Sequence, residues 1–105
     1  MIISNARHYS RAMIRTFRHK GLGRFFTKNE RRGIDAKQAD RIRRILDRLD
    51  GATRAEDMNL PGLKFHGLTG TRKGTSSVWV SGNWRITFGF EAGDAVNVNL
   101  EDYHS

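Results

Sequence analysis

The sequence contains no cysteine, which excludes disulfide bonds, thiolate catalysis and zinc sites built on cysteine. Long apolar runs are also missing, since no stretch approaches the roughly 18 residues that are needed to cross a bilayer. Residues 1–12 carry two arginines but lack the continuous apolar stretch of a secretory signal. We therefore expect a cytoplasmic protein without a membrane partner.

The chain has 105 residues, which leaves room for one domain with one hydrophobic core. Its 19 Lys and Arg against 11 Asp and Glu give a net charge of +8. This charge is concentrated: residues 1–50 hold fourteen basic and five acidic residues, whereas residues 51–105 hold five and six. A basic half attracts RNA, DNA or an acidic protein. The alternative is a solvated helix surface without a partner.

The first half predicts one strand and two helices. Residues 13–18 alternate apolar and polar side chains, as a short half-buried strand does. A short helix is expected over residues 22–28. A longer helix should run from Asp35, which can cap it, to Gly51, which can end it. Its apolar stripe would pack on a sheet, and its other side is cationic, with Arg41, Arg44 and Arg48 as candidate RNA-binding residues.

In the second half the apolar period changes to two, which predicts strands over residues 63–68, 76–81, 84–90 and 96–101. Gly82 and Asn83 suit a two-residue turn, which would place Trp79 opposite Ile86 and Ser77 opposite Phe88. In the last strand Val96 and Val98 should alternate with polar residues. The predicted fold is α+β, with an N-terminal strand and two helices packed on one face of a mostly antiparallel sheet.

Two histidines lie where a sheet could bring them together. His66 is in an otherwise apolar strand, and if Phe65 points into the core, His66 points to the opposite face, the one expected for Arg85. His104 follows Asp102 and Tyr103 after the last strand. Each of these could be an ordinary surface residue, but together they suggest a site.

The residue types suit cleavage of RNA by its own 2′-hydroxyl, which needs a base, an acid and a cation for the phosphorane. Histidine can act as base or acid near neutral pH, and arginine offers a fixed fork of donors to phosphate. Tyrosine can bind phosphate or stack on an unpaired base, and Asp102, if buried, could orient His104. The reaction needs no metal or other cofactor. His66, His104 and Asp102 could in principle hold a cation, but their spacing is not that of a zinc site.

Residues 67–74 are glycine-rich and basic. They do not form a Walker loop, because Lys73 precedes a strand and not a helix. We expect a flexible hairpin loop that brings Arg72 and Lys73 near the site, where they and Asn83 would bind phosphate. By themselves these residues indicate a basic α+β domain with RNA as a candidate ligand.

Four stretches resemble the HigB toxins of the RelE/ParE superfamily of plasmid-maintenance killer proteins: residues 13–22, 65–70, 77–88 and 101–104. The most specific parts are Asn83-Trp84-Arg85 and the final Asp102-Tyr103-His104. The likeness begins at Met13. Residues 1–12 are therefore expected to be an extension outside the family pattern, and residues 13–105 a single RelE-like toxin domain.

The resemblance implies a microbial-RNase-like fold and a ribosome-dependent mRNA endoribonuclease that blocks translation. It also implies a helix-turn-helix antitoxin of the HigA kind, through which alone the toxin would meet operator DNA. By position, the catalytic residues would be His66, Arg85, Asp102, Tyr103 and His104. Two positions depart from the pattern: Thr69 stands where a catalytic lysine is expected, and Gly89 where a polar or basic residue is common.

The lost lysine could slow cleavage, with Arg72 or Lys73 standing in, or abolish it. The alternative function is a non-enzymatic toxin or corepressor, since related ParE toxins poison gyrase without hydrolysing RNA, and a weakened toxin could act through antitoxin binding. A free-standing RNA-binding module is a third possibility.

Overall fold

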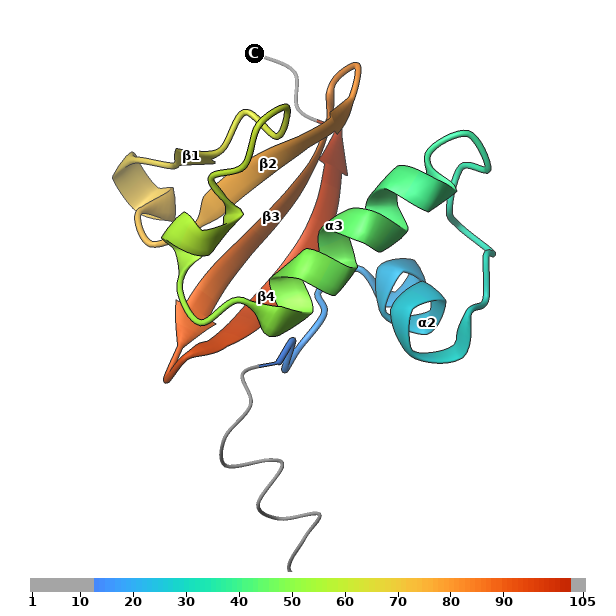
Figure 1. The fold of residues 1–105 in the computed structure, drawn as a ribbon, viewed down its shortest axis with the longest axis horizontal. Helices are drawn as coiled ribbons and strands as arrows, with labels where there is room; N and C mark the ends of the chain where they lie inside the picture. Colours follow the sequence, from blue (N-terminus) through green and yellow to red (C-terminus); the bar gives the residue numbers. More distant parts are fainter. Residues whose placement is uncertain (1–12, 103–105) are drawn as a thin grey trace, which may run out of the picture.

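The computed structural model describes residues 13–102, so that residues 1–12 and 103–105, with Tyr103 and His104, lie outside the described part. The elements are α2 (Lys20–Lys28), α3 (Ala39–Gly51), the short 3₁₀ helices η1 (Ala55–Met58) and η2 (Gly70–Arg72), and strands β1 (His66–Gly67), β2 (Ser76–Ser81), β3 (Trp84–Glu91) and β4 (Asp94–Asp102). The strands form one antiparallel sheet in the order β1-β2-β3-β4. Helix α3 crosses one face of this sheet and α2 lies beside it (Figure 1), which confirms the α+β class. No helix within residues 13–102 is long and apolar enough to cross a membrane.

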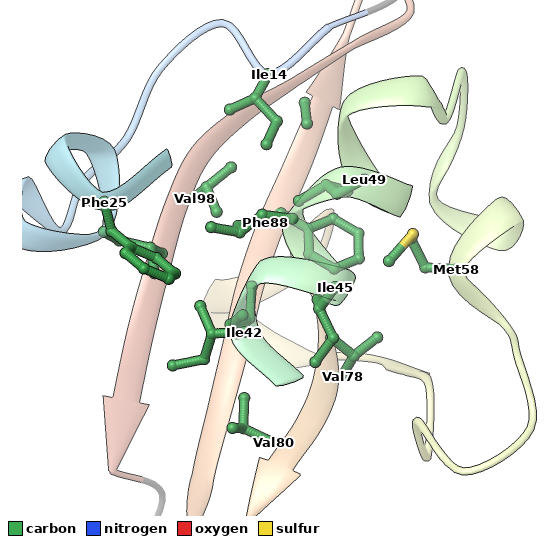
Figure 2. Packing of buried hydrophobic residues seen from close by; sticks show 14 of the residues in the cluster. Ile14, Phe25, Ile42, Ile45, Leu49, Met58, Val78, Val80, Phe88 and Val98 are labelled. Atoms are coloured by element: carbon green, nitrogen blue, oxygen red, sulfur yellow. The ribbon is translucent and has the colours of Figure 1, made fainter. Parts of the chain in front are cut away.

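The core lies between α3 and the sheet (Figure 2). The apolar stripe predicted for the long helix is confirmed, since Ile42, Ile45, Leu46 and Leu49 are each at most 3 % exposed. They pack with buried side chains of the three longer strands, including Val78, Val80, Ile86, Phe88 and Val98. Burial of each large aliphatic side chain contributes about 1.5–3 kcal/mol. The core therefore fixes which face of the sheet is covered by helices.

The N-terminal segment runs parallel to β4 without forming a full strand. Ile14 and Phe17 make isolated bridges to Ala95 and Val98. The N–H of Ile14 donates instead to Oδ1 of Asp50 on α3, at 2.9 Å. The predicted strand over residues 13–18 is thus present only as a bridged extended segment.

The short helix α2 begins two residues before the predicted start. His19 caps it, because its Nδ1 accepts from the N–H of Leu22 at 2.9 Å. This side chain occupies the position usually taken by Ser, Thr, Asp or Asn. The helix ends at Lys28, as predicted.

The long helix ends at Gly51, as predicted, but its predicted start and the predicted capping at both ends are wrong. The Asp35 carboxylate accepts from the N–H of Lys37 at 3.0 Å in the preceding turn, and α3 itself begins at Ala39. Gly51 is the last helical residue, and the chain leaves through Ala52 in an extended conformation, without a left-handed glycine stop. The apolar periodicity located the helix, whereas the capping residues did not.

A bulge changes the register between β2 and β3. Ser81 pairs with Trp84, as the two-residue turn predicts, but the register shifts by one residue between Ser81 and Trp79. Trp79 therefore lies opposite Arg85, and the predicted pairing with Ile86 is wrong. The shift continues along the ladder, where the observed pairs are Val78 with Ile86, Ser77 with Thr87, and Ser76 with Phe88.

A second bulge lies between β3 and β4, where the register shifts between Thr87 and Gly89. Asn97 has a left-handed φ of 55°, which bends the strand at this point. Val98 stays in the core, but Val96 pairs with Gly89 and lies outside the core cluster. The alternation predicted for the last strand is therefore wrong at Val96.

The strand predicted over residues 63–68 is reduced to the two residues of β1. Lys64 has a left-handed φ of 49°, which interrupts the extended chain. Before β1 the chain still contacts β2, since the carbonyl of Leu63 accepts from the N–H of Trp79 at 2.7 Å.

Candidate active site

The sheet face turned away from α3, called the far face below, carries two predicted site residues. His66 pairs with Ser77, which pairs with Thr87. Arg85 lies two residues before Thr87 on β3 and opposite Glu101 on β4. Because paired residues and residues two apart project to the same side, His66, Arg85 and Glu101 share the far face. The sequence prediction that His66 and Arg85 share one face is confirmed.

Two clefts open on this face. One, of about 350 Å³, is lined by His66, Gly67, Leu68, Thr69 and Arg72, and is called the His66 cleft below. The other, of about 370 Å³, lies where residues 71–75 meet β3 and β4, and Arg18 and Lys73 also line it. Arg72 lines both clefts. Its side chain therefore stands at their boundary.

Arg72 makes a bidentate ion pair with Glu101. Nη1 donates to Oε1 at 2.9 Å and Nη2 donates to Oε2 at 2.6 Å. The carboxylate also accepts from Oγ1 of Thr87 at 2.6 Å and from Nδ2 of Asn99 at 3.4 Å. Planar forks of this kind fix both partners in direction as well as in distance. The pair thus ties the loop that follows β1 to the far side of the sheet.

These bonds hold Glu101 in its charged form. The hydrogen bond from Arg72 is the main cause that lowers the pKa of Glu101 from 4.5 to about 2, and burial of the carboxyl opposes it. The Thr87 hydroxyl and the positive charge of Arg72 lower the pKa further. Glu101 is therefore a carboxylate throughout the physiological range.

The other predicted phosphate-binding residues of the sheet side lie at two separate places. Lys73 is exposed and lines the second cleft, over β3 and β4. Asn83 is exposed in the turn before β3, at the end of the sheet where Trp84 pairs with Asp102. The loop does not require glycine at position 89, because a Cβ there would lie in ordinary contact, 3.5 Å from the carbonyl oxygen of Gly74.

Asp102 differs from what the sequence argument assumed. Its side chain is exposed, so the buried carboxylate expected beside His104 is not found. It lies one residue beyond Glu101 and opposite Trp84, and therefore on the other side of the strand. Tyr103 and His104 follow outside the described residues, so their approach to His66 and Arg85 stays a prediction.

The helix arginines lie on the covered side of the molecule, away from the far face. Arg41, Arg44 and Arg48 line a groove of about 260 Å³ together with Ile45, Leu60, Pro61 and Leu63. Nη2 of Arg41 donates to the carbonyls of Gly62 and Trp79, at 3.0 and 3.3 Å. Arg41 is therefore a structural anchor, while Arg44 and Arg48 are exposed at the rim.

Sequence reasoning missed Glu101 as a residue of the site and the surroundings of Trp79. Glu101 follows the apolar Leu100 in the last strand, so alternation along the strand could have placed it on the same face as Arg85. Its partner Arg72, however, lies 29 residues away in a loop. Trp79 has two cations over its ring, with Arg41 Cζ at 5.2 Å and Lys64 Nζ at 4.3 Å. Only the bulge, which the sequence does not reveal, places it beside Arg85.

Within residues 13–102 no group of three His, Cys, Asp or Glu side chains is close enough to hold a metal ion. The geometry defines a class: a small basic α+β protein whose helices cover one face of an antiparallel sheet and whose other face carries histidine, arginine and two polar clefts.

Residues 15–104 match the family described as the RelE-like toxin of the type II toxin-antitoxin system HigB, and the chain belongs to this family. It is 46 % identical over 92 residues to the endoribonuclease HigB of Proteus vulgaris, a match that covers 88 % of this chain and 100 % of that relative.

Proposed function

We propose that this chain is a ribosome-dependent mRNA endoribonuclease that inhibits translation. The observation that carries the proposal is the shared far face of His66 and Arg85, beside a cleft that His66 and Arg72 line. The name of the Proteus vulgaris relative, an endoribonuclease, supports the same activity. We expect the protein to act in the cytoplasm, where its proposed substrate, ribosome-bound mRNA, is found.

The reaction proposed is attack by the 2′-hydroxyl of RNA on the neighbouring phosphorus. The P–O2′ bond forms and the P–O5′ bond breaks, which leaves a 2′,3′-cyclic phosphate and a 5′-hydroxyl end. One group takes the 2′ proton and another supplies a proton to the leaving 5′-oxygen, and His66 and His104 can share these roles. Arg85 would stabilise the charge that develops on the phosphorane, with Tyr103 and Asp102 supporting phosphate and histidine. No metal ion is required.

The partners proposed follow from the family. A type II toxin is neutralised by an antitoxin, and we expect one of the HigA helix-turn-helix kind, which would link the toxin to operator DNA. Arg44 and Arg48 lie on the opposite side of the molecule from the far face. They would therefore contact ribosomal RNA, or else an acidic part of the antitoxin, and not the strand being cut.

Induced expression tests the activity in cells. We expect growth arrest and new mRNA 5′ ends with the wild-type chain, and neither with Arg85→Ala or His104→Ala. Loss of one charge-stabilising donor lowers rates by about a hundredfold or more, enough to abolish arrest. Equal arrest by the wild type and both variants would contradict catalysis and favour the alternative, a toxin or corepressor that acts by binding alone.

A further inference from the structure

The His66 cleft contains one permanently charged group among the residues that line it, the guanidinium of Arg72. The other lining residues are His66, Gly67, Leu68 and Thr69. A phosphodiester that enters this cleft needs a cation nearby, because its negative charge leaves bulk water on binding. Arg72 stands at the wall where such a group would lie.

The two partners of the ion pair differ in exposure. The side chain of Arg72 is 42 % exposed, whereas that of Glu101 is 19 % exposed. The half-exposed guanidinium of Arg72 is therefore held by the less exposed carboxylate of Glu101, which also accepts hydrogen bonds from Thr87 and Asn99. An arginine that is already fixed loses less conformational freedom when it binds a phosphate.

We propose that Arg72 binds the RNA phosphate in the His66 cleft and that Glu101 is the positioning residue that aims its guanidinium. This inference rests on the proposed function for the identity of the ligand, and it goes further by naming the cation of the cleft and the residue that orients it. The phosphate-binding role in the His66 cleft falls to Arg72 and not to Lys73, because Lys73 lines only the second cleft.

The probe for the site is a short single-stranded RNA in which every 2′-hydroxyl is methylated, so that it binds but cannot be cut. Arg72→Ala should weaken its binding at least about tenfold, and the slope of log affinity against log salt should fall by about 0.7, as for one lost phosphate contact on a single strand. Arg24→Ala is the matched control, because it removes an arginine from an exposed ion pair with Glu30 on another part of the surface. Unchanged binding by Arg72→Ala would overturn the inference.

A charge exchange separates positioning from a purely structural role. In the double variant with Arg72→Glu and Glu101→Arg, the ion pair can re-form, so resistance to urea should recover relative to Arg72→Ala. Binding of the methylated RNA should stay as weak as in Arg72→Ala, because the cation has moved to β4. Recovery of both properties would mean that the pair only holds the loop, and would overturn the proposal. Arg72→Lys keeps the charge without the fork and should bind with intermediate affinity.

Cleavage on ribosomes is measured in parallel, so that the two claims fail separately. A wild-type chain that binds the methylated RNA through Arg72 but never cuts mRNA would contradict the proposed activity and support the phosphate site. A chain that cuts mRNA at the wild-type rate with Arg72→Ala would contradict the phosphate site alone.

Discussion

At the scale of single residues, the far face is organised by the ion pair of Arg72 and Glu101. It joins a loop with little regular structure to the central strands, through Thr87 on β3 and Asn99 on β4. Without this link the loop would be held by the two residue pairs between β1 and β2 and by backbone hydrogen bonds such as that from the N–H of Leu68 to the carbonyl of Thr75. The geometry of the His66 cleft therefore depends on the charge of one carboxylate.

This charge makes stability depend on pH. The pKa of Glu101 is lowered from 4.5 to about 2, so its contribution is fully present above about pH 4.5 and is lost as the pH falls through about 2. Glu101→Gln should be less stable at pH 7 by on the order of 1–3 kcal/mol, as for hydrogen bonds to a charged group, and this difference should shrink by pH 2.5.

Urea unfolding at several pH values measures the difference. Glu30→Gln serves as control, because the exposed pair of Glu30 with Arg24 should contribute little at any pH. A gap between wild type and Glu101→Gln that stays the same from pH 7 to pH 2.5 would show that the carboxylate charge is not its source.

The sequence predicted the common face of His66 and Arg85, because alternation along a strand is a local property. It did not predict Glu101 as a member of the site, since the bond to Arg72 depends on how a loop folds back over the sheet. The catalytic roles of His66, Arg85, Asp102, Tyr103 and His104 stay predictions.

At the scale of elements, α3 has three distinct sides. One packs in the core, one holds the chain beside it through Arg41, and one presents Arg44 and Arg48. The sequence predicted a core side and a cationic side but not the division within the cationic side. A helical wheel cannot show which arginine meets the carbonyls of Gly62 and Trp79.

This division predicts different effects for neighbouring arginines. Arg41→Ala should lower the free energy of unfolding by about 1–3 kcal/mol, since it leaves two carbonyls without a charged donor and removes a cation from the Trp79 ring. Arg44→Ala should change it by less than about 0.5 kcal/mol, as for an exposed surface residue. Thermal unfolding of both variants checks this, and equal losses would contradict the anchoring role of Arg41.

The strands β2 and β3 were located best, since β2 has the predicted bounds 76–81 and β3, predicted over residues 84–90, ends at Glu91. The start of α3 and the pairing partners of the strands were located less well. Asp35 and His19 show why: both can accept a backbone N–H, and only tertiary packing decides that His19 caps a helix while Asp35 closes a turn. The one-residue bulge between Trp79 and Ser81 and the left-handed Asn97 were likewise not predicted from the sequence.

At the scale of the whole molecule, basic side chains lie on two opposite sides. Arg44 and Arg48 are on the helix side, and Arg18, Arg72 and Lys73 line the clefts of the far face. Cationic side chains on both sides of the molecule suit a binding site that is surrounded by RNA better than they suit a single flat RNA surface. This distribution is consistent with action inside a ribosome.

The first residues of the domain expected from the sequence, residues 13–105, are anchored in the fold. Met13 donates its N–H to Oδ1 of Asp94, and Ile14 belongs to the core. A chain of residues 13–105 should therefore keep the free energy of unfolding within about 0.5 kcal/mol of the full chain, and should arrest growth equally. Urea unfolding and induced expression of both chains test this, and loss of arrest by the shorter chain would assign a function to residues 1–12.

The most direct test of the central claim is the chemistry of the RNA ends made by purified protein on ribosomes that carry a defined mRNA. We expect cuts in the ribosome-bound mRNA that leave 2′,3′-cyclic phosphate and 5′-hydroxyl ends. Cleavage should not require an added metal ion, and it should be at least about a hundredfold slower with Arg85→Ala. Intact mRNA, or cuts that leave 5′-phosphate ends, would contradict a toxin that cleaves RNA through its own 2′-hydroxyl.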